Sequence, residues 1–212
     1  MATPLNDYTE EQIQSIHTCY TNPVHFISNY CLVNTPTRGH LLMNPTDKQI
    51  QLINTLNDRS SCHAIHVDRQ EGKTSASLAY LLWCVIFKVN TNCIFVSIKK
   101  SNSDDSRYTF MSMYDMLPEC LKIQITRKKP STIEFENGSR IFFTSTNEIL
   151  NGSLKGITIS LCILDEFYFY QKPIDLLEVI IPNTFSNGSC KIVSSDNPHK
   201  PTPVSGFKHI ML

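Results

Sequence analysis

Apolar residues recur every three or four positions through the first quarter of the chain, as they do along one face of a helix. This spacing predicts a first helix over 9 to 20 and a third over 46 to 57, each opened by a Thr-x-x-Gln capping box. Pro23 suits the first position of a short second helix. The stretch 34 to 45 has no such period and is predicted to be an irregular connector.

The pattern changes near residue 60 to short apolar runs that alternate with longer helical stretches. Short apolar runs predict buried strands, and the stretches between them predict helices. The predicted strands cover 63 to 68, 93 to 98, 159 to 164 and 190 to 195, and the predicted helices cover 73 to 88 and 103 to 117. Strands that alternate with helices favour a mostly parallel sheet covered on both faces, which is an α/β, three-layer fold.

One segment breaks this alternation. The sequence STIEFENGSRIFFTS, 131 to 145, alternates apolar and polar residues on both sides of Asn137-Gly138. Asn-Gly between two alternating runs is a strong hairpin signal because both residues accept the left-handed backbone of a tight turn. The sequence therefore predicts one antiparallel hairpin inserted into the parallel sheet.

Composition adds limits on the kind of protein. The 19 Lys and Arg balance the 19 Asp and Glu, so binding of nucleic acid would need a local basic patch rather than an overall positive charge. Two short basic runs, Lys99-Lys100 and Arg127-Lys128-Lys129, are candidates for such a patch. Each could equally be a solvated loop or strand end.

The eight cysteines are scattered without Cys-x-x-Cys spacing, which indicates neither a zinc site nor a redox pair and favours a reducing setting. The N-terminus has no secretory pattern, and the longest apolar run, 78 to 87, is too short to span a bilayer. Trp83 and the aromatic run 167 to 170 are predicted to pack in the core rather than stack on bases.

Candidate chemistry begins directly after the first predicted strand. HVDRQEGKTS, 66 to 75, supplies a strand end, a tight turn and a helix start, the three parts of a phosphate-binding loop. In such a loop Gly72 lets the backbone approach a phosphate, Lys73 reaches the β and γ oxygens, and the Thr74 hydroxyl binds Mg²⁺. Val67 stands where the usual first glycine would be, so an ordinary loop-to-helix junction is the alternative.

A second candidate element ends the later apolar run LCILDEF, 161 to 167. Asp165 is placed to hold Mg²⁺ through water, and Glu166 to orient and deprotonate an attacking water. Two carboxylates at the end of a buried strand are costly without a cation or hydrogen-bond partners. Together with the loop, they indicate the branch of P-loop NTPases that has an additional strand and a catalytic glutamate.

Several stretches in order resemble the N-terminal ATPase region of large terminase subunits, the DNA-packaging motors of tailed phages and herpesviruses. The resemblance covers roughly 20 to 200, nearly the whole chain. It is carried by NPVHFISNYC, PTRG, DRQEGKT, STIEFENGSRIFFTST, LKGITISLCILDEFYFY and KIVSSDNP. The family's own phosphate loop also lacks the first glycine and contains an arginine, here Arg69.

The resemblance implies a site of several residues. Glu166, Arg69 and Lys73 would be catalytic, and Thr74 and Asp165 would hold the metal. The nucleotide, ATP with Mg²⁺, would be bound by Gln49, Arg69, Gln70, Gly72, Lys73, Thr74, Ser75, Asp165, Ser195 and Asp196. Alternatives remain for several of them. Gln49 could serve only its capping box, and Arg69 could form a surface ion pair with Asp68 or Glu71. Ser195 and Asp196 could only cap the strand and begin a turn.

Three departures from the family pattern bear on activity. Asp68 and Glu71 add negative charge to a loop meant for phosphates, unless they point outward or pair with Arg69. Asp196 stands where the family usually has threonine or serine in the coupling motif, with Ser195 before it. Lys155-Gly156 replaces Arg-Gly, and lysine lacks the bidentate bonding of arginine.

The resemblance also implies a biological role and partners. ATP hydrolysis would drive double-stranded DNA into a capsid, with the portal protein, the small terminase subunit and a separate nuclease chain as partners in a homo-oligomeric ring. The setting would be the host cell interior, with no membrane. The expected organisation is an N-terminal helical segment, 1 to 45, and an ATPase domain, 46 to 212, with the family's lid and nuclease domain absent.

Two other functions stay open from the sequence. One is a helicase-like DNA ATPase of the same branch. The other is a truncated or split terminase piece that binds nucleotide without hydrolysing it and acts as an interaction module.

Overall fold

The centre of the protein is an eight-stranded sheet, seen in a computed structural model that describes residues 9–35, 39–58, 62–184, 188–195 and 206–212. The strand order is β10-β3-β9-β8-β4-β7-β6-β5. The first six strands in this order are parallel, and β6 and β5 complete the sheet as an antiparallel pair beside β7. The strands are β3 His63–His66, β4 Asn92–Ser97, β5 Ile125–Lys128, β6 Thr132–Phe135, β7 Arg140–Ser145, β8 Leu161–Asp165, β9 Ser189–Ser194 and β10 Lys208–Met211.

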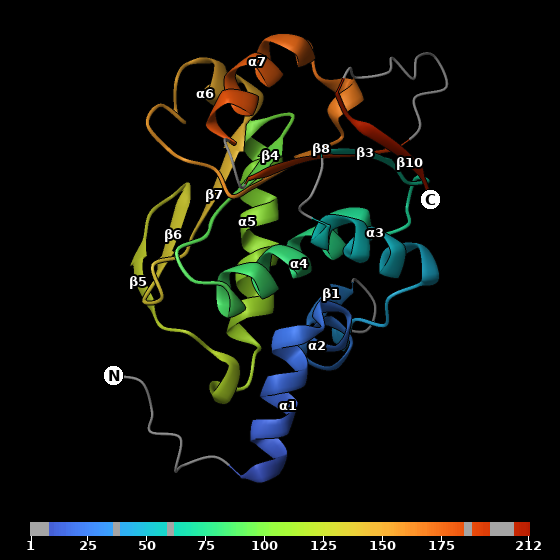
Figure 1. Ribbon diagram of the computed structural model, residues 1–212, viewed down its shortest axis with the longest axis vertical. Coiled ribbons are helices and arrows are strands. Elements are labelled where there is room, and N and C mark those ends of the chain that lie inside the picture. Colours follow the sequence, from blue (N-terminus) through green and yellow to red (C-terminus); the bar gives the residue numbers. More distant parts are fainter. Residues whose placement is uncertain (1–8, 36–38, 59–61, 185–187, 196–205) are drawn as a thin grey trace.

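Helices cover both faces of this sheet, which makes the predicted α/β three-layer fold (Figure 1). The helices of one face are α1 Glu10–Thr21, α2 Pro23–Tyr30, α3 Asp47–Asn57, α4 Lys73–Phe87 and α5 Lys100–Asp115. The helices of the other face are α6 Thr146–Leu150 and α7 Pro173–Asn183. Two short 3₁₀ turns, Glu119–Leu121 and Phe167–Phe169, connect neighbouring elements.

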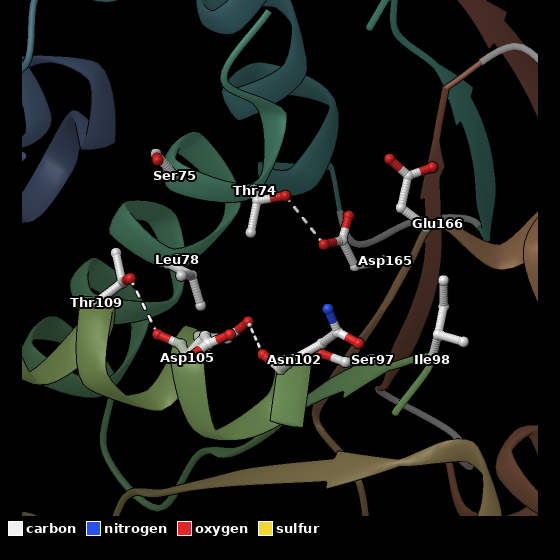
Figure 2. Close-up of a pocket in the computed structure, with 11 residues that line it drawn as sticks. Thr74, Ser75, Leu78, Ser97, Ile98, Asn102, Asp105, Thr109, Asp165 and Glu166 are labelled. Carbon is white, nitrogen blue, oxygen red and sulfur yellow. Dashed lines mark hydrogen bonds between the residues drawn. The ribbon is translucent and has the colours of Figure 1, made fainter. Parts of the chain in front are cut away.

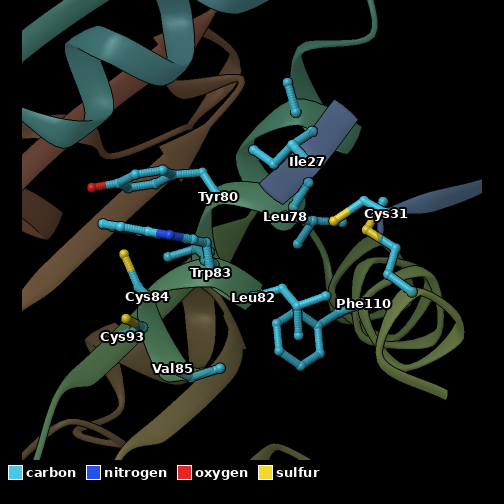
Figure 3. Packing of buried hydrophobic residues seen from close by; sticks show 14 of the residues in the cluster. Ile27, Cys31, Leu78, Tyr80, Leu82, Trp83, Cys84, Val85, Cys93 and Phe110 are labelled. Carbon is cyan, nitrogen blue, oxygen red and sulfur yellow. The ribbon is translucent and has the colours of Figure 1, made fainter. Parts of the chain in front are cut away.

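The central strands build two hydrophobic cores because successive side chains point to opposite faces of a sheet. On β4, Cys93 and Phe95 belong to the core beneath α4, whereas Ile94 and Val96 belong to the core beneath α7. Helix α4 is apolar on nearly all sides because α2, α3, α5 and the sheet surround it. Figure 3 shows this larger core, in which Trp83 is buried beside Tyr80, as predicted. The prediction is wrong for Phe169 of the run 167 to 170, which is 39% exposed.

The cysteines behave as small core residues. All eight are free, and six of them are buried. Burial raises the pKa of the Cys19 thiol to about 11 and that of Cys31 further still. Both thiols therefore stay protonated and apolar at neutral pH.

Helices α1 and α2 share the core of α4. Trp83 donates a hydrogen bond from Nε1 to the carbonyl of Cys19 at 2.7 Å, and Phe26 meets Phe87 edge to face. Helices α1 and α2 thus contribute to the same packed layer. In the described ranges, no helix combines the length and the apolar character that crossing a bilayer requires.

The predicted hairpin is confirmed, and its turn does more than reverse the chain. Gly138 has φ +78°, the left-handed conformation that glycine accepts most readily. The Asn137 amide donates to the carbonyls of Val85 at 2.8 Å and Lys88 at 3.1 Å, and the Ser139 hydroxyl donates to Lys88 at 2.6 Å. The turn therefore satisfies carbonyls at the carboxyl end of α4, which would otherwise lack partners.

The structure corrects two of the predicted elements. The connector predicted at 34 to 45 contains a two-stranded antiparallel hairpin of β1 Leu32–Thr35 and β2 Gly39–Leu42, in which the Thr35 hydroxyl donates to the Gly39 carbonyl. The helix predicted from 103 begins at Lys100 instead, and its first turn is closed by the Ser103 N–H, which donates to the Lys99 carbonyl at 3.1 Å. Strands β5 and β10 were not predicted.

Candidate functional site

The loop between β3 and α4 has the backbone shape that binds phosphate. Gln70 and Gly72 both have φ +66°, so the chain turns sharply before α4 begins at Lys73. Gly72 is the N-cap of α4, and no side chain caps the free N–H groups of the first turn. A Cβ at Gly72 would lie 2.6 Å from the Gln49 side-chain nitrogen, so only glycine fits there without displacement. Free amides at a helix start favour an anion.

Gln49 ties helix α3 to this loop. Its Oε1 accepts a hydrogen bond from the Thr46 N–H at 3.1 Å, which confirms the predicted capping box. Its Nε2 donates to the Glu71 carbonyl at 2.8 Å. The side chain therefore has a structural function at both ends, and its predicted contact with adenine remains a prediction.

The acidic residues of the loop are paired with a residue that the sequence did not suggest. Lys48 of α3 forms ion pairs with the carboxylates of Asp68 and, at 3.6 Å, of Glu71. In the described part of the chain Arg69 has neither of the ion pairs considered for it. Its guanidinium lies 5.7 Å from the centre of the Phe169 ring. Lys48 thus draws the two carboxylates towards α3 and offsets their charge.

Glu166 connects the loop to two strand ends. One carboxylate oxygen lies 2.7 Å from Lys73 Nζ, and the other accepts hydrogen bonds from the Ser195 N–H at 3.2 Å and its hydroxyl at 2.9 Å. Burial alone would raise the pKa of Glu166, but the bonds from Lys73 and Ser195 outweigh burial and hold the pKa below its usual value. The residue follows β8 in the left-handed conformation, with φ +55°, which brings its carboxylate beside the end of β9.

Asp165 has the opposite electrostatic environment. Its Oδ2 accepts a hydrogen bond from the Thr74 hydroxyl at 2.9 Å, while its Oδ1 is buried and has no hydrogen-bond partner among the described residues. Burial raises the pKa of Asp165 to about 6, although the bond from Thr74 acts against the increase. The pKa of Asp165 is thus raised and that of Glu166 is lowered. Neighbouring carboxyls with opposite pKa shifts are typical of sites where the two groups have different chemical roles.

A cavity of about 320 Å³ opens between α4 and α5 beside these carboxylates. Figure 2 shows Thr74 hydrogen-bonded to Asp165 on one side and the Asn102 amide pointing into the same space from α5. Ser75 lines the cavity with Ser97 and Asp105. Sequence reasoning missed the β4 and α5 residues, and the polar run that follows the predicted strand at 93 to 98 was the available signal.

The residues present fit a Mg²⁺ ion with a nucleotide. A hydroxyl and a carboxylate are oxygen ligands of the kind Mg²⁺ prefers, and the buried Asp165 Oδ1 still lacks a partner. Over the described ranges, no three His, Cys, Asp or Glu side chains form a metal cage. Mg²⁺ commonly completes its shell with water and substrate phosphates, so Thr74 and Asp165 suffice as protein contacts.

The predicted site residues are only partly brought together. The contacts above bring five of them together: Lys73, Thr74, Asp165, Glu166 and Ser195. The other predicted residues lie around this set: Gln49 against the loop, Arg69 and Gln70 on its exposed side, Ser75 in the cavity wall and Lys155 exposed in the turn before β8. Asp196 is outside the described residues.

The fold and its loop define a P-loop NTPase. A family model described as "Terminase large subunit, T4likevirus-type, N-terminal" matches residues 68–211, more than half of the chain. The chain therefore belongs to the large terminase subunit family, in its N-terminal region, and the resemblance stated from the sequence is confirmed. Comparison with curated proteins gives no match.

Solved structures with the same fold include terminases and a helicase. The large terminase of bacteriophage HK97 has a TM-score of 0.66 at 19% identity, covering 82% of this chain and 37% of its own. The large terminase of a thermophilic bacteriophage, in complex with ADP, has a TM-score of 0.55 at 16% identity, covering 80% and 45%. The UvsW helicase of bacteriophage T4 has a TM-score of 0.61 at 10% identity, covering 91% and 67%. The chain spans less than half the length of both terminases.

Proposed function

We propose that this chain is a Mg²⁺-dependent ATPase of a phage DNA-packaging motor. The observation that carries the proposal is the contact set that joins three strand ends: Lys73 to Glu166, Thr74 to Asp165, and Ser195 to Glu166. The ADP complex of the thermophilic phage terminase supports nucleotide binding in a protein of this fold. The family match supports the terminase role.

Phosphate binding is assigned to the start of α4. The free N–H groups after Gly72 and the Lys73 ammonium both favour the negative oxygens of a triphosphate. Lys73 lies against Glu166 in the protein alone, so a nucleotide would take one of its N–H donors from that carboxylate. The ion pair is therefore the contact that nucleotide binding would loosen.

Proton transfer is assigned to Glu166. Its low pKa keeps it ionised at neutral pH, and Ser195 fixes the position of one carboxylate oxygen. Glu166 would accept the proton of a water whose oxygen attacks the γ-phosphorus, while the bond from that phosphorus to the bridging oxygen breaks. The products are ADP and inorganic phosphate. Mg²⁺, held by Thr74 and Asp165, would neutralise charge on the phosphate oxygens.

Two further roles belong to the loop and its neighbour. Arg69 would stabilise charge on the γ-phosphate by turning away from the Phe169 ring on which it lies. Gln49 would read the adenine edge with its amide, which requires it to exchange its bond to the Glu71 carbonyl. Both proposals predict that nucleotide binding rearranges a contact present in the protein alone.

The partners follow from the family. We expect double-stranded DNA, the portal protein, the small terminase subunit and a nuclease chain, in a ring of several copies inside the infected host cell. The helicase alternative is favoured by the similarity to UvsW. Strand separation of a forked duplex, measured beside ATP turnover, distinguishes the two: a packaging ATPase hydrolyses ATP without unwinding the fork.

The deciding experiment measures ATP turnover with and without Mg²⁺, and with and without DNA, for the wild type and Glu166→Gln. Glu166→Gln keeps the size of the side chain but cannot accept the proton, so turnover should fall by about 10²- to 10⁴-fold while ATP still binds. Equal turnover of the two proteins would refute the catalytic assignment. ATP binding without turnover in the wild type would favour the non-hydrolysing module.

A further inference from the structure

A second cavity, of about 600 Å³, opens on the same edge of the sheet as the nucleotide site. Its walls come from the segments that follow β4, β7 and β8, and include Lys99, Thr146, Asn147, Phe169, Gln171 and Lys172. These three strands are parallel neighbours, so the segments after them meet at one edge. We call this cavity the basic groove. It differs in charge from the cavity beside Asp165.

The basic groove carries positive charge and no lining carboxylate. Lys99 and Lys172 are both exposed, and within the described ranges neither forms an ion pair. Amides of asparagine and glutamine add hydrogen-bond donors between them. The cavity beside the nucleotide loop is lined instead by three carboxylates, those of Asp105, Asp165 and Glu166. One cavity thus suits a cation and the other suits an anion.

The neighbouring lysine shows how a similar charge is neutralised. Lys100 follows Lys99 directly, but its ammonium lies 2.9 Å from Asp104 and 3.8 Å from a Glu148 oxygen. These ion pairs offset the positive charge of Lys100, so that charge is less available to a ligand. They also engage carboxylates of α5 and α6 that would otherwise oppose an anion in the groove.

An exposed ring joins the basic groove to the phosphate loop. Phe169 is 39% exposed, follows Glu166 by three residues and lines the groove. The guanidinium of Arg69 lies 5.7 Å from its ring centre, which brings a third positive charge to this side. Cationic side chains and amide donors along one groove suit the phosphates of a nucleic acid backbone.

We propose that the basic groove binds the sugar–phosphate backbone of DNA through Lys99 and Lys172. The identity of the ligand rests on the proposed function, whereas the location rests on the groove itself. The other basic run, Arg127-Lys128-Lys129, lies on β5 at the far end of the sheet from β8. Lys128 there lines a cavity with Arg107 and Asp115, so a carboxylate faces that cavity, whereas none lines the basic groove.

The test measures the affinity of a fluorescently labelled DNA duplex by anisotropy over a series of salt concentrations. The double variant Lys99→Ala/Lys172→Ala should bind at least about tenfold more weakly at roughly 0.1 M salt. The slope of log affinity against log salt should shrink by about 2, close to one unit for each lost phosphate contact. Lys128→Ala is the matched control and should keep both affinity and slope.

The same preparations separate this proposal from the proposed function. Basal ATP turnover without DNA should be unchanged in the double variant, because neither lysine contacts the nucleotide site. A wild type that binds DNA but shows no turnover would refute the ATPase and leave the groove supported if the double variant loses affinity. The groove is refuted if the double variant binds like the wild type, if Lys128→Ala loses affinity instead, or if the wild type does not bind DNA.

Discussion

Among the residues that the structure describes, two lysines are buried, and they lie in very different surroundings. Lys73 is 7% exposed at the start of α4, where its ammonium meets Glu166 at the carboxyl edge of the sheet. Lys191 is fully buried in the middle of β9. Its ammonium contacts His63 Nδ1 at 2.7 Å and the carbonyl of Asp58. Burial of a lysine side chain is therefore common to a predicted site and to a position outside it.

Lys73 and Lys191 differ in whether a ligand could replace the partner of the buried ammonium. Glu166 is partly exposed and borders an open cavity, so a phosphate could replace it beside Lys73. In the described part of the chain, the partners of Lys191 include a backbone carbonyl and a buried imidazole, and both belong to the fold itself. A buried charge indicates function where its partner is replaceable, and structure where its partner is fixed.

The largest expected effect comes from Lys73→Ala. Loss of a preorganised positive charge at the transferred phosphate should lower ATP turnover by about 10²- to 10³-fold, measured under saturating ATP. The free energy of unfolding should change by less than about 1 kcal/mol, because the released Glu166 still has Ser195 and access to solvent. A large loss of stability with normal turnover of the folded fraction would show that Lys73, like Lys191, serves the fold rather than the reaction.

Lys191→Ala should give the reverse result. The lost side chain leaves a cavity in a packed layer and removes a partner of His63, so the free energy of unfolding should fall by about 2–5 kcal/mol in denaturant titration. Lys191→Met keeps most of the volume and should lose less. Turnover per folded molecule should stay within about twofold, and a drop as deep as that of Lys73→Ala would break the distinction.

A smaller effect is expected at Ser195, which touches the site only through Glu166. Ser195→Ala removes the hydroxyl bond to the carboxylate but keeps the backbone bond, so turnover should fall about tenfold. Ser195→Thr retains a hydroxyl and should restore most of it. A direct contact with the nucleotide would instead raise KM in Ser195→Ala with kcat unchanged, which would reject the positioning role.

The smallest effect concerns pH. Asp165 has a pKa of about 6 in the folded protein, whereas an unfolded aspartate has a pKa of about 4. The folded state therefore binds the proton more tightly, and ionisation of this group costs stability as pH rises from about 4 to 6. Asp165→Asn lacks this cost. With Mg²⁺ removed by chelation, its stability relative to wild type should rise over that window by on the order of 1 kcal/mol.

The converse observation would be equally informative for Asp165. A difference between the two proteins that does not vary with pH would show that the carboxyl titrates as in an unfolded chain. The buried, unpartnered Oδ1 would then lack the strong desolvation assigned to it. The metal assignment would lose the structural observation on which it depends.

Strong local signals were enough to predict most strands of the sheet. They also predicted the phosphate loop and the acidic pair of the site. The Thr-x-x-Gln boxes, Asn137-Gly138 and the apolar runs each act over a few residues, so they remain visible in the sequence. The hairpin at β1 and β2 was missed because its strands are short and largely exposed and do not alternate clearly. Strand β10 was missed because only its pairing with β3 makes it a strand.

The sequence by itself determined the chemistry available to this protein: a glycine-lysine-threonine loop, an acidic pair after a buried strand, and a serine-rich strand end. These are properties of consecutive residues. The tertiary structure alone decided the partners, because they come from segments far apart in the chain. Lys48 offsets Asp68, Ser195 holds Glu166, and Lys99 and Lys172 line one groove. The parallel sheet brings these segments to one edge, and contacts between segments so far apart cannot be predicted from local sequence patterns.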